Sequence, residues 1–179
     1  MTLHIITGNE VDPFTLHGNE RIRVPVTHLG VCGEAGPVLA NEFIFGCILD
    51  RFPKLKLVCS ESEVSWLPYW LFRVRQIQDE FGPTLKVPEI KKPVDEYMKQ
   101  IYHGLIDDPF LHIVLELIDP KTIMWGSDFP HTRCTYPNTR DVIDRVFSRL
   151  EPETRDDIVF NNCARLYNFD PSIVKAAVS

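Results

Sequence analysis

The sequence predicts an α/β fold in which short buried strands alternate with amphipathic helices. Four apolar runs of strand length lead into glycine or polar residues, and a segment with apolar side chains at helical spacing follows each run. This alternation is typical of βα units, whose strands pair in parallel. Four units are half of an eight-stranded βα barrel, and 179 residues are too few for a complete barrel, which needs about 250.

The composition, 44% hydrophobic and 25% charged, is that of a soluble globular protein with a real core. A formal net charge of −6 argues against a nucleic-acid partner or an anionic membrane surface. No apolar run reaches membrane-spanning length and no secretory leader is recognisable, so we expect a cytoplasmic protein. The five cysteines lack CxxC spacing and are expected to be reduced thiols.

The first 20 residues contain many turn signals and little periodicity. A short strand at residues 3–6 is the one regular element that we expect there. His4 and His17 have no other ligand-type residue at metal-binding spacing, and both are interpreted as incidental. The predicted divisions of the chain are an irregular segment at 1–20, a domain at 21–169 and a tail at 170–179.

The first strand of the predicted domain ends in a histidine. Alternating apolar residues at 22–26 lead to His28 and then to a glycine-containing loop. A lone buried histidine most often hydrogen-bonds to backbone, but the position of His28 at a strand end favours a functional role. A helix is predicted next over residues 38–51, and it ends before Pro53.

The second predicted strand, at residues 55–59, leads into two carboxylates, Glu61 and Glu63. A buried carboxylate needs a hydrogen-bonding partner or a metal ion. We therefore expect Glu61 to have a functional role. Glu63 is expected to point into solvent beyond the strand end.

The second half of the chain has the same order of elements. A helix is predicted over residues 66–81, ended by Gly82-Pro83, and a strand over residues 101–105 contains His103. Asp107-Asp108-Pro109 is typical of a helix start, because an acidic cap precedes a proline in the first turn. Further helices are predicted over residues 110–118, 139–150 and 152–167.

The most informative stretch is Thr-Ile-Met-Trp-Gly-Ser-Asp-Phe-Pro-His at residues 122–131. Its apolar run predicts a short buried strand, which ends at Gly126, and Pro130 prevents the strand from continuing. Asp128 is therefore expected at the carboxyl end of a strand, and His131 follows closely. In βα barrels this end carries the catalytic residues, because the loops there meet at one mouth.

The motif at residues 125–131 resembles the final-strand motif of the amidohydrolase-related family of metal-dependent TIM-barrel enzymes. That family includes aminocarboxymuconate-semialdehyde decarboxylase and the resorcylate-type decarboxylases of aromatic acids. Three further pieces resemble the family in order and approximate spacing: residues 51–57, residues 66–69 with Arg73, and residues 162–167.

This resemblance implies that the chain is the C-terminal half, about strands five to eight, of a (β/α)8 TIM barrel of the metal-dependent hydrolase superfamily. His28 falls at the fifth-strand metal ligand. Asp128 falls at the eighth-strand carboxylate, which contacts the metal and takes part in proton transfer. Glu61 stands at a sixth-strand position that is often histidine, and is interpreted as a ligand or a catalytic acid/base. His131 and His103 are predicted to contact the substrate.

The resemblance also implies a divalent metal cofactor, Zn²⁺ by preference with Mn²⁺ as the alternative, since imidazole and carboxylate suit both ions. The reaction implied is hydrolysis or decarboxylase-type C–C cleavage. Its substrate is expected to be a small organic molecule that is carboxylated or cyclic.

A second interpretation is a non-catalytic half barrel, either a truncated copy or a subunit that needs a partner half. The sequence lacks the HxH or ExH ligand pair of the first strand. Open strand edges favour association, and homodimers are usual in the resembled family. A binding module on a doubly wound sheet is not favoured, because there is no GxGxxG or GxxxxGK[ST] phosphate loop.

Overall fold

The protein contains one parallel sheet of four strands in the order β1-β2-β3-β4. The computed structural model describes residues 1–4, 35–85, 88–132 and 134–170. The strands are β1 (Thr2–His4), β2 (Leu57–Ser60), β3 (Ile101–Leu105) and β4 (Ile123–Trp125). Every neighbouring pair is parallel, which confirms the predicted βα organisation.

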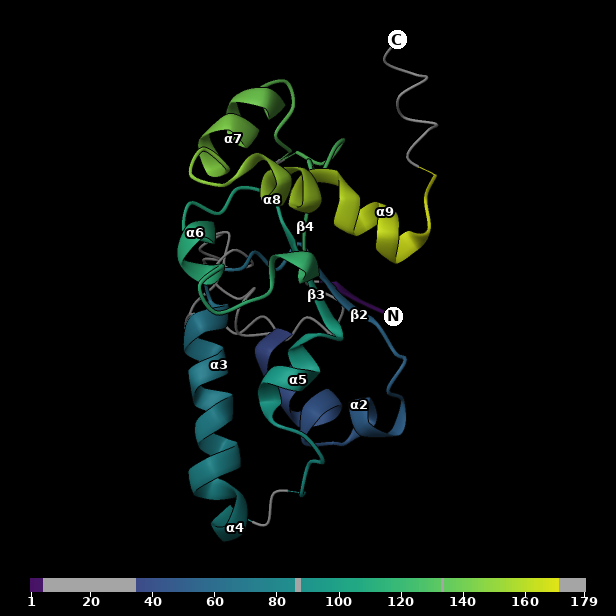
Figure 1. Ribbon diagram of the computed structural model, residues 1–179, viewed down its shortest axis with the longest axis vertical. Helices are drawn as coiled ribbons and strands as arrows, with labels where there is room; N and C mark the ends of the chain where they lie inside the picture. The colour runs from purple at the N-terminus through teal and green to yellow at the C-terminus, as the bar shows by residue number, and fades with distance from the viewer. Residues whose placement is uncertain (5–34, 86–87, 133, 171–179) are drawn as a thin grey trace, which may run out of the picture.

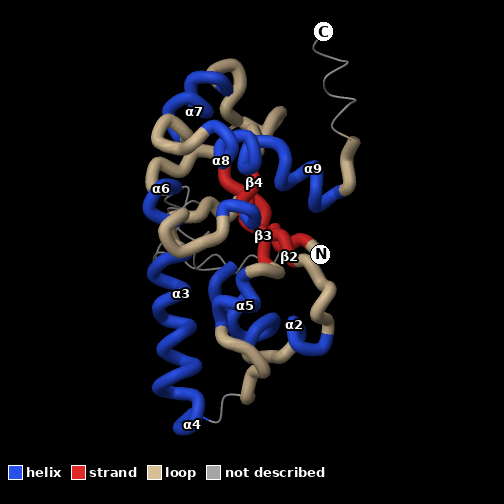
Figure 2. Tube along the Cα trace, in the orientation of Figure 1, coloured by secondary structure: helices blue, strands red, loops and turns tan. Residues whose placement is uncertain are grey.

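Helices surround the strands on several sides. Figure 2 shows the strands together in the middle, with α2, α3 and α5 towards one end and α7, α8 and α9 towards the other. The α-helices are α2 (Ile48–Arg51), α3 (Leu67–Gln76), α4 (Gly82–Leu85), α5 (Val94–Met98), α6 (Leu111–Val114), α7 (Thr139–Val146), α8 (Pro152–Asp156) and α9 (Asn162–Tyr167). Three π-helical segments (Leu39–Ile44, Ile77–Phe81, Asp157–Asn161) and one 3-10 turn (Pro120–Thr122) complete the described helices.

The strand register separates the side chains onto two faces of the sheet. On the core face, one row across β2, β3 and β4 consists of Cys59, His103 and Ile123. Helical residues such as Leu39, Leu67, Leu71, Leu111, Phe147 and Ile158 are buried in the same hydrophobic core. On the second face, the neighbouring row begins with His4 on β1 and Ser60 on β2. The strand ends therefore present polar residues on the face opposite the core.

Several predicted helix boundaries are wrong. The helices expected over residues 110–118 and 139–150 end early, at Val114 and Val146. The helix expected over residues 38–51 is interrupted after Ile44, and Cys47 takes a left-handed conformation with φ of 57°. A Cβ added at Gly46 would lie 2.3 Å from the Glu42 carbonyl oxygen, so this turn requires glycine. The helix expected to end at Gly82-Pro83 continues to Leu85, because Gly82 keeps right-handed helical angles.

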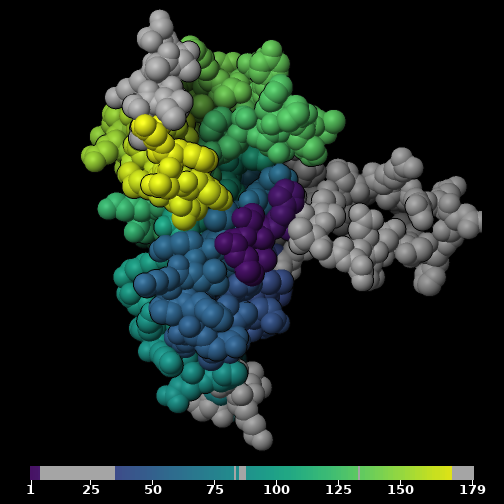
Figure 3. Space-filling model, turned by 90° about the vertical axis from the view of Figure 1, so that its right-hand side faces the viewer, coloured from purple at the N-terminus to yellow at the C-terminus, as the bar shows by residue number. Residues whose placement is uncertain are grey.

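The strand predicted at residues 22–26 lies outside the described part of the chain and stays a prediction. The described strand beside β2 is β1, in which Thr2 pairs with Val58 and His4 with Ser60. Figure 3 shows residues 1–4 in purple at the surface, beside the blue segment that contains β2. In the part of the chain that the structure describes, no helix is long and apolar enough to span a bilayer.

Candidate active site

The carboxyl ends of β1 and β2 bring His4 and Glu61 together. His4 is the last residue of β1, and its Nε2 lies 2.8 Å from Oε1 of Glu61. The parallel register produces this contact, because His4 pairs with Ser60 and Glu61 follows directly. Glu61 turns the chain away from the strand with φ of 56°. Both side chains remain partly exposed and can therefore reach a ligand.

The expectation that His4 has no ligand-type partner is thus wrong. Its partner is 57 residues away in the sequence, so a search for ligands at short spacing misses the pair. His4 lies at the end of a short apolar segment, which is the same pattern that favours a functional role for His28. His28 and His17 both lie outside the described residues, and the metal-binding role of His28 stays a prediction.

The loop after β4 brings Asp128 and His131 together. Nδ1 of His131 lies 2.9 Å from Oδ2 of Asp128, and the His131 backbone N–H donates to the Asp128 carbonyl at 2.8 Å. The backbone of Asp128 has a left-handed conformation with φ of 58°, and the chain therefore turns back immediately after the strand. The Asp128 side chain is 17% exposed and the His131 side chain 62%, so the carboxylate is sheltered and the imidazole faces solvent.

Two other carboxylates connect the loop after β2 to the loop after β3. The Glu63 carboxylate accepts the backbone N–H groups of Ile106 and Asp107 at 3.1 and 3.3 Å. Asp108 accepts those of Val64 and Ser65 at 2.9 and 2.7 Å. The expectation that Glu63 points into solvent is therefore wrong. Burial raises the pKa of its carboxyl, while the two backbone hydrogen bonds act in the opposite direction.

The loops after β3 and β4 are connected in a similar way. Trp125 donates its Nε1–H to the carbonyl of Ile106 at 2.9 Å, and the Gly126 N–H donates to the Leu105 carbonyl at 3.0 Å. Backbone and side-chain hydrogen bonds therefore run across the carboxyl ends of β2, β3 and β4. The candidate site is built on fixed loop ends.

His103 lies on the other face of the sheet, away from these side chains. Its ring is fully buried in contact with Trp66, with ring centroids 6.4 Å apart. Neither ring nitrogen has a hydrogen-bond partner among the described residues. Burial lowers the pKa of His103 to about 3, so the imidazole is neutral. The structure does not bring His103 to the strand ends, and its position does not support the predicted substrate contact.

The described cysteines are all free thiols, as expected: Cys47, Cys59, Cys134 and Cys163. Cys59 lies on β2 beneath the helices, and burial raises the pKa of its thiol to about 12. A thiol with so high a pKa is a poor nucleophile and a poor metal ligand. Cys59 is therefore part of the core and not of the site.

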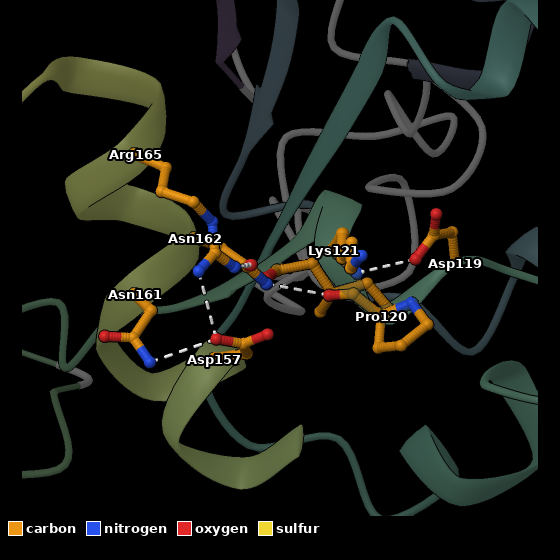
Figure 4. Close-up of polar contacts among 8 residues, drawn as sticks. Asp119, Pro120, Lys121, Asp157, Asn161, Asn162 and Arg165 are labelled. Carbon is orange, nitrogen blue, oxygen red and sulfur yellow. Dashed lines mark hydrogen bonds and ion pairs between the residues drawn. The ribbon is translucent and has the colours of Figure 1, made fainter. Parts of the chain in front are cut away.

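Helix α9 anchors the strand that leads to Asp128. The Asn162 side-chain amide donates to the carbonyls of Pro120 and Ile123, each at 2.7 Å (Figure 4). Arg165 donates to the Asn162 side-chain oxygen and forms an ion pair with Asp157 at 3.1 Å. These contacts fix β4 against the C-terminal helices. Residues 162–167, one of the segments that resemble the amidohydrolase-related family, therefore have a structural role.

The described residues offer metal donors but no complete metal site. No group of three or more histidine, cysteine, aspartate or glutamate side chains in them lies close enough to bind one ion. His4 and Glu61 provide an imidazole and a carboxylate, a donor pair that suits divalent Zn²⁺ or Mn²⁺. Asp128 follows β4, two strand spacings from β2 and three from β1, or about 10 and 14 Å along a flat sheet and less in a curved one.

A parallel βα sheet with histidine and carboxylate side chains at its carboxyl ends is the architecture of a βα-barrel enzyme. The chain belongs to the amidohydrolase family, whose model matches residues 38–169. Its fold is the C-terminal half of a (β/α)8 barrel, which confirms the predicted fold class. A comparison with curated proteins finds no match.

Several solved structures share this fold. One is 5-carboxyvanillate decarboxylase from Sphingomonas paucimobilis, with a TM-score of 0.65 and 19% identity over 78% of this chain and 41% of that chain. The Novosphingobium aromaticivorans enzyme, solved with manganese, has a TM-score of 0.65 and 17% identity over 82% and 44%. A 2,6-dihydroxybenzoate decarboxylase from Rhizobium has a TM-score of 0.60 and 18% identity over 78% and 42%. The chain thus spans less than half the length of these structures.

Proposed function

We propose that this chain supplies the C-terminal part of a metal-dependent active site that decarboxylates or hydrolyses a small cyclic carboxylic acid. The observation that carries the proposal is the 2.8 Å contact between His4 and Glu61 at the carboxyl ends of β1 and β2. A histidine and a carboxylate paired at that edge have no evident role in the core. They have the donor chemistry of a divalent-metal site.

In this proposal His4 replaces His28 as the fifth-strand ligand, because β1 is the strand that pairs with β2. Glu61 is the sixth-strand ligand. Asp128, the carboxylate of the last strand, does not join this pair around one ion in the described residues. An imidazole and a carboxylate suit Mn²⁺ as well as the Zn²⁺ expected from the sequence. When bound, such an ion polarises a substrate oxygen or an attacking water.

The pair of Asp128 and His131 has the geometry for proton transfer. In a decarboxylation, the ring carbon that loses CO₂ must gain a proton, and in a hydrolysis the attacking water must lose one. We propose that the Asp128 carboxylate moves this proton. The His131 imidazole, 2.9 Å from it, holds the carboxylate in position. A cyclic carboxylic acid is supported as the substrate class by the solved decarboxylases that share the fold.

A second candidate function is a non-catalytic half barrel that is active only with a partner. It is supported by the incomplete donor group in the described residues and by the share of the solved structures that the chain spans. Under this alternative the chain alone would bind a divalent ion weakly and turn over no substrate.

Metal binding by the purified chain tests the proposal. We expect isothermal titration calorimetry to detect Mn²⁺ binding, and expect Glu61→Gln and His4→Gln each to weaken it by about 10-fold or more. His112→Gln is the matched control, because His112 lies on α6 beside Arg149 and away from the strand ends. Absence of Mn²⁺ binding, or equal affinity in all four proteins, would reject the assignment of these ligands.

A further inference from the structure

Two exposed aromatic rings lie next to the proposed catalytic pair. Phe129 directly follows Asp128, and its side chain is 63% exposed; Tyr136, at the other end of the same loop, is 65% exposed. The two ring centroids are 5.3 Å apart with an interplanar angle of 65°, an edge-to-face arrangement. The geometry leaves a large part of both rings open to solvent. We call Phe129 and Tyr136 the aromatic pair.

Hydrogen bonds hold the described residues at both ends of the loop that carries the aromatic pair, on either side of residue 133, which lies outside the described part of the chain. The Thr135 N–H donates to the Ser127 carbonyl at 3.0 Å, which closes the loop at its base. The Phe129 N–H donates to Oγ of Ser127 at 3.3 Å, and the Thr135 hydroxyl pairs with Thr139 at the start of α7. The backbone next to each ring is therefore held by hydrogen bonds. A rigid aromatic residue binds a ligand at a lower entropic cost than a mobile one.

Exposure alone does not mark a binding site in this protein. Tyr69 and Phe72 are 71% and 53% exposed, and they lie on helix α3, outside the strand-end loops that carry the proposed catalytic residues. The aromatic pair differs because it belongs to the loop that carries Asp128 and His131. Phe129 directly follows Asp128 in this loop, and His131 lies two residues further on.

We propose that the aromatic pair recognises the ring of an aromatic carboxylic acid and positions it beside Asp128. This inference rests on the proposed function and names the part of the substrate that the loop binds. A flat ring gains offset-stacked or edge-to-face contact with Phe129 and Tyr136, whereas a saturated ring of similar size cannot adopt that geometry. The His131 imidazole, 62% exposed, is available to donate a hydrogen bond to an anionic substituent.

Two probes of equal charge and similar size test the proposal: benzoate and cyclohexanecarboxylate. Their affinities for the full chain are measured by ligand-observed NMR titration with Zn²⁺ present, since Zn²⁺ is diamagnetic. We expect benzoate to bind about 2- to 10-fold more tightly, which is the range that aromatic contacts add beyond buried area. Phe129→Leu and Tyr136→Leu should each reduce this preference. Phe72→Leu, which changes an exposed ring on α3, should leave it unchanged.

The outcomes separate this inference from the proposed function. Absence of benzoate binding, equal affinity for both probes, or a preference that survives both loop substitutions would overturn the role of the aromatic pair. Circular dichroism confirms that each variant is folded. Mn²⁺ affinity is measured in parallel: if Phe129→Leu keeps it, the metal site stands independently of ring recognition. If metal binding fails while the benzoate preference persists, the proposed metal function alone is rejected.

Discussion

At the scale of single residues, the carboxylates beyond the strand ends fall into two groups according to their partners. Glu63 and Asp108 accept hydrogen bonds from backbone amides of neighbouring loops. Glu61 and Asp128 contact histidine side chains and remain partly exposed. A carboxylate whose oxygens are occupied by amides stabilises loops, whereas one beside an imidazole is available to a metal or a proton. We therefore assign structural roles to the first group and chemical roles to the second.

Two neighbouring aspartates give a matched test of this division. Asp108→Ala removes the acceptor of three backbone amides, the buried one of Val64 and the part-buried ones of Ser65 and Phe110. We expect it to lower the free energy of unfolding by about 3 kcal/mol or more, measured by urea denaturation. Asp107→Ala removes an exposed ion pair with Arg145 and should lower the free energy of unfolding far less. Equal effects would contradict the structural role of Asp108.

The buried imidazole of His103 predicts a pH-dependent stability. Burial lowers its pKa to about 3 in the folded protein, while an unfolded chain has a histidine pKa near 6.5. Below about pH 6.5 the unfolded state therefore binds a proton that the folded state does not. The free energy of unfolding should fall as the pH falls through this window. The His103 contribution between pH 7 and pH 5 is about 2 kcal/mol.

A substitution isolates this contribution from those of other titrating groups. His103→Phe should reduce the loss of stability between pH 7 and pH 5, because the buried ring no longer differs in protonation between the two states. His112→Gln changes a partly exposed histidine hydrogen-bonded to Arg149 and serves as the control. The measurement is urea denaturation of the three proteins at both pH values. An unchanged pH dependence in His103→Phe would show that the imidazole titrates normally.

These residues also define what the sequence could predict about the site. Asp128 and His131 were recognisable because strand, turn and histidine follow one another within a single motif. His4 was missed because its contact with Glu61 arises from parallel pairing of distant strands. His103 was placed at a strand end by pattern, but a strand alternates its faces, and the register turned this residue towards the core.

At the scale of elements, Asn162 joins the last helix to the last strand. It is 1% exposed and donates to the carbonyls of Pro120 and Ile123, of which the Ile123 bond is buried. Asn162→Ala should cost about 2 kcal/mol of stability, because the Ile123 carbonyl loses a buried partner and the Pro120 carbonyl loses a second one. Asn161→Ala removes one contact with the partly exposed Asp157 and should cost less than about 1 kcal/mol. Thermal unfolding followed by circular dichroism compares the two variants, and a similar loss in both would refute the anchoring role.

The strands were easier to predict than the ends of the helices. Residues 101–105 and the strand of the 122–131 motif were predicted correctly because apolar runs of that length between polar turns fit buried parallel strands. The helix interruption at Gly46 was missed because glycine is tolerated in a helical pattern, and the steric conflict with the Glu42 carbonyl is a property of the folded turn. Helix termini depend on tertiary contacts that periodicity does not contain.

At the scale of the whole molecule, the described sheet has two outer strands, β1 and β4. Among the described residues, no strand pairs with the outer edge of either. Such edges carry unpaired backbone groups that favour pairing with another chain. We therefore expect self-association in solution, with the β1 edge as one of the contacts. The net charge of −6 opposes association of identical copies, so higher salt should strengthen it.

The backbone pattern of β1 allows a substitution that tests this edge alone. The Val58 N–H donates to the Met1 carbonyl, so in a parallel ladder the N–H of Thr2 points away from β2. Thr2→Pro removes this outward donor and leaves the β1–β2 hydrogen bonds in place, since proline is compatible with an edge strand. Thr2→Val, which keeps the N–H, is the matched control.

Sedimentation velocity across a dilution series should show weaker association for Thr2→Pro than for Thr2→Val. Identical association of both variants would exclude the β1 edge as a contact between copies. A monomer at every concentration would mean that neither edge of this sheet pairs with another copy.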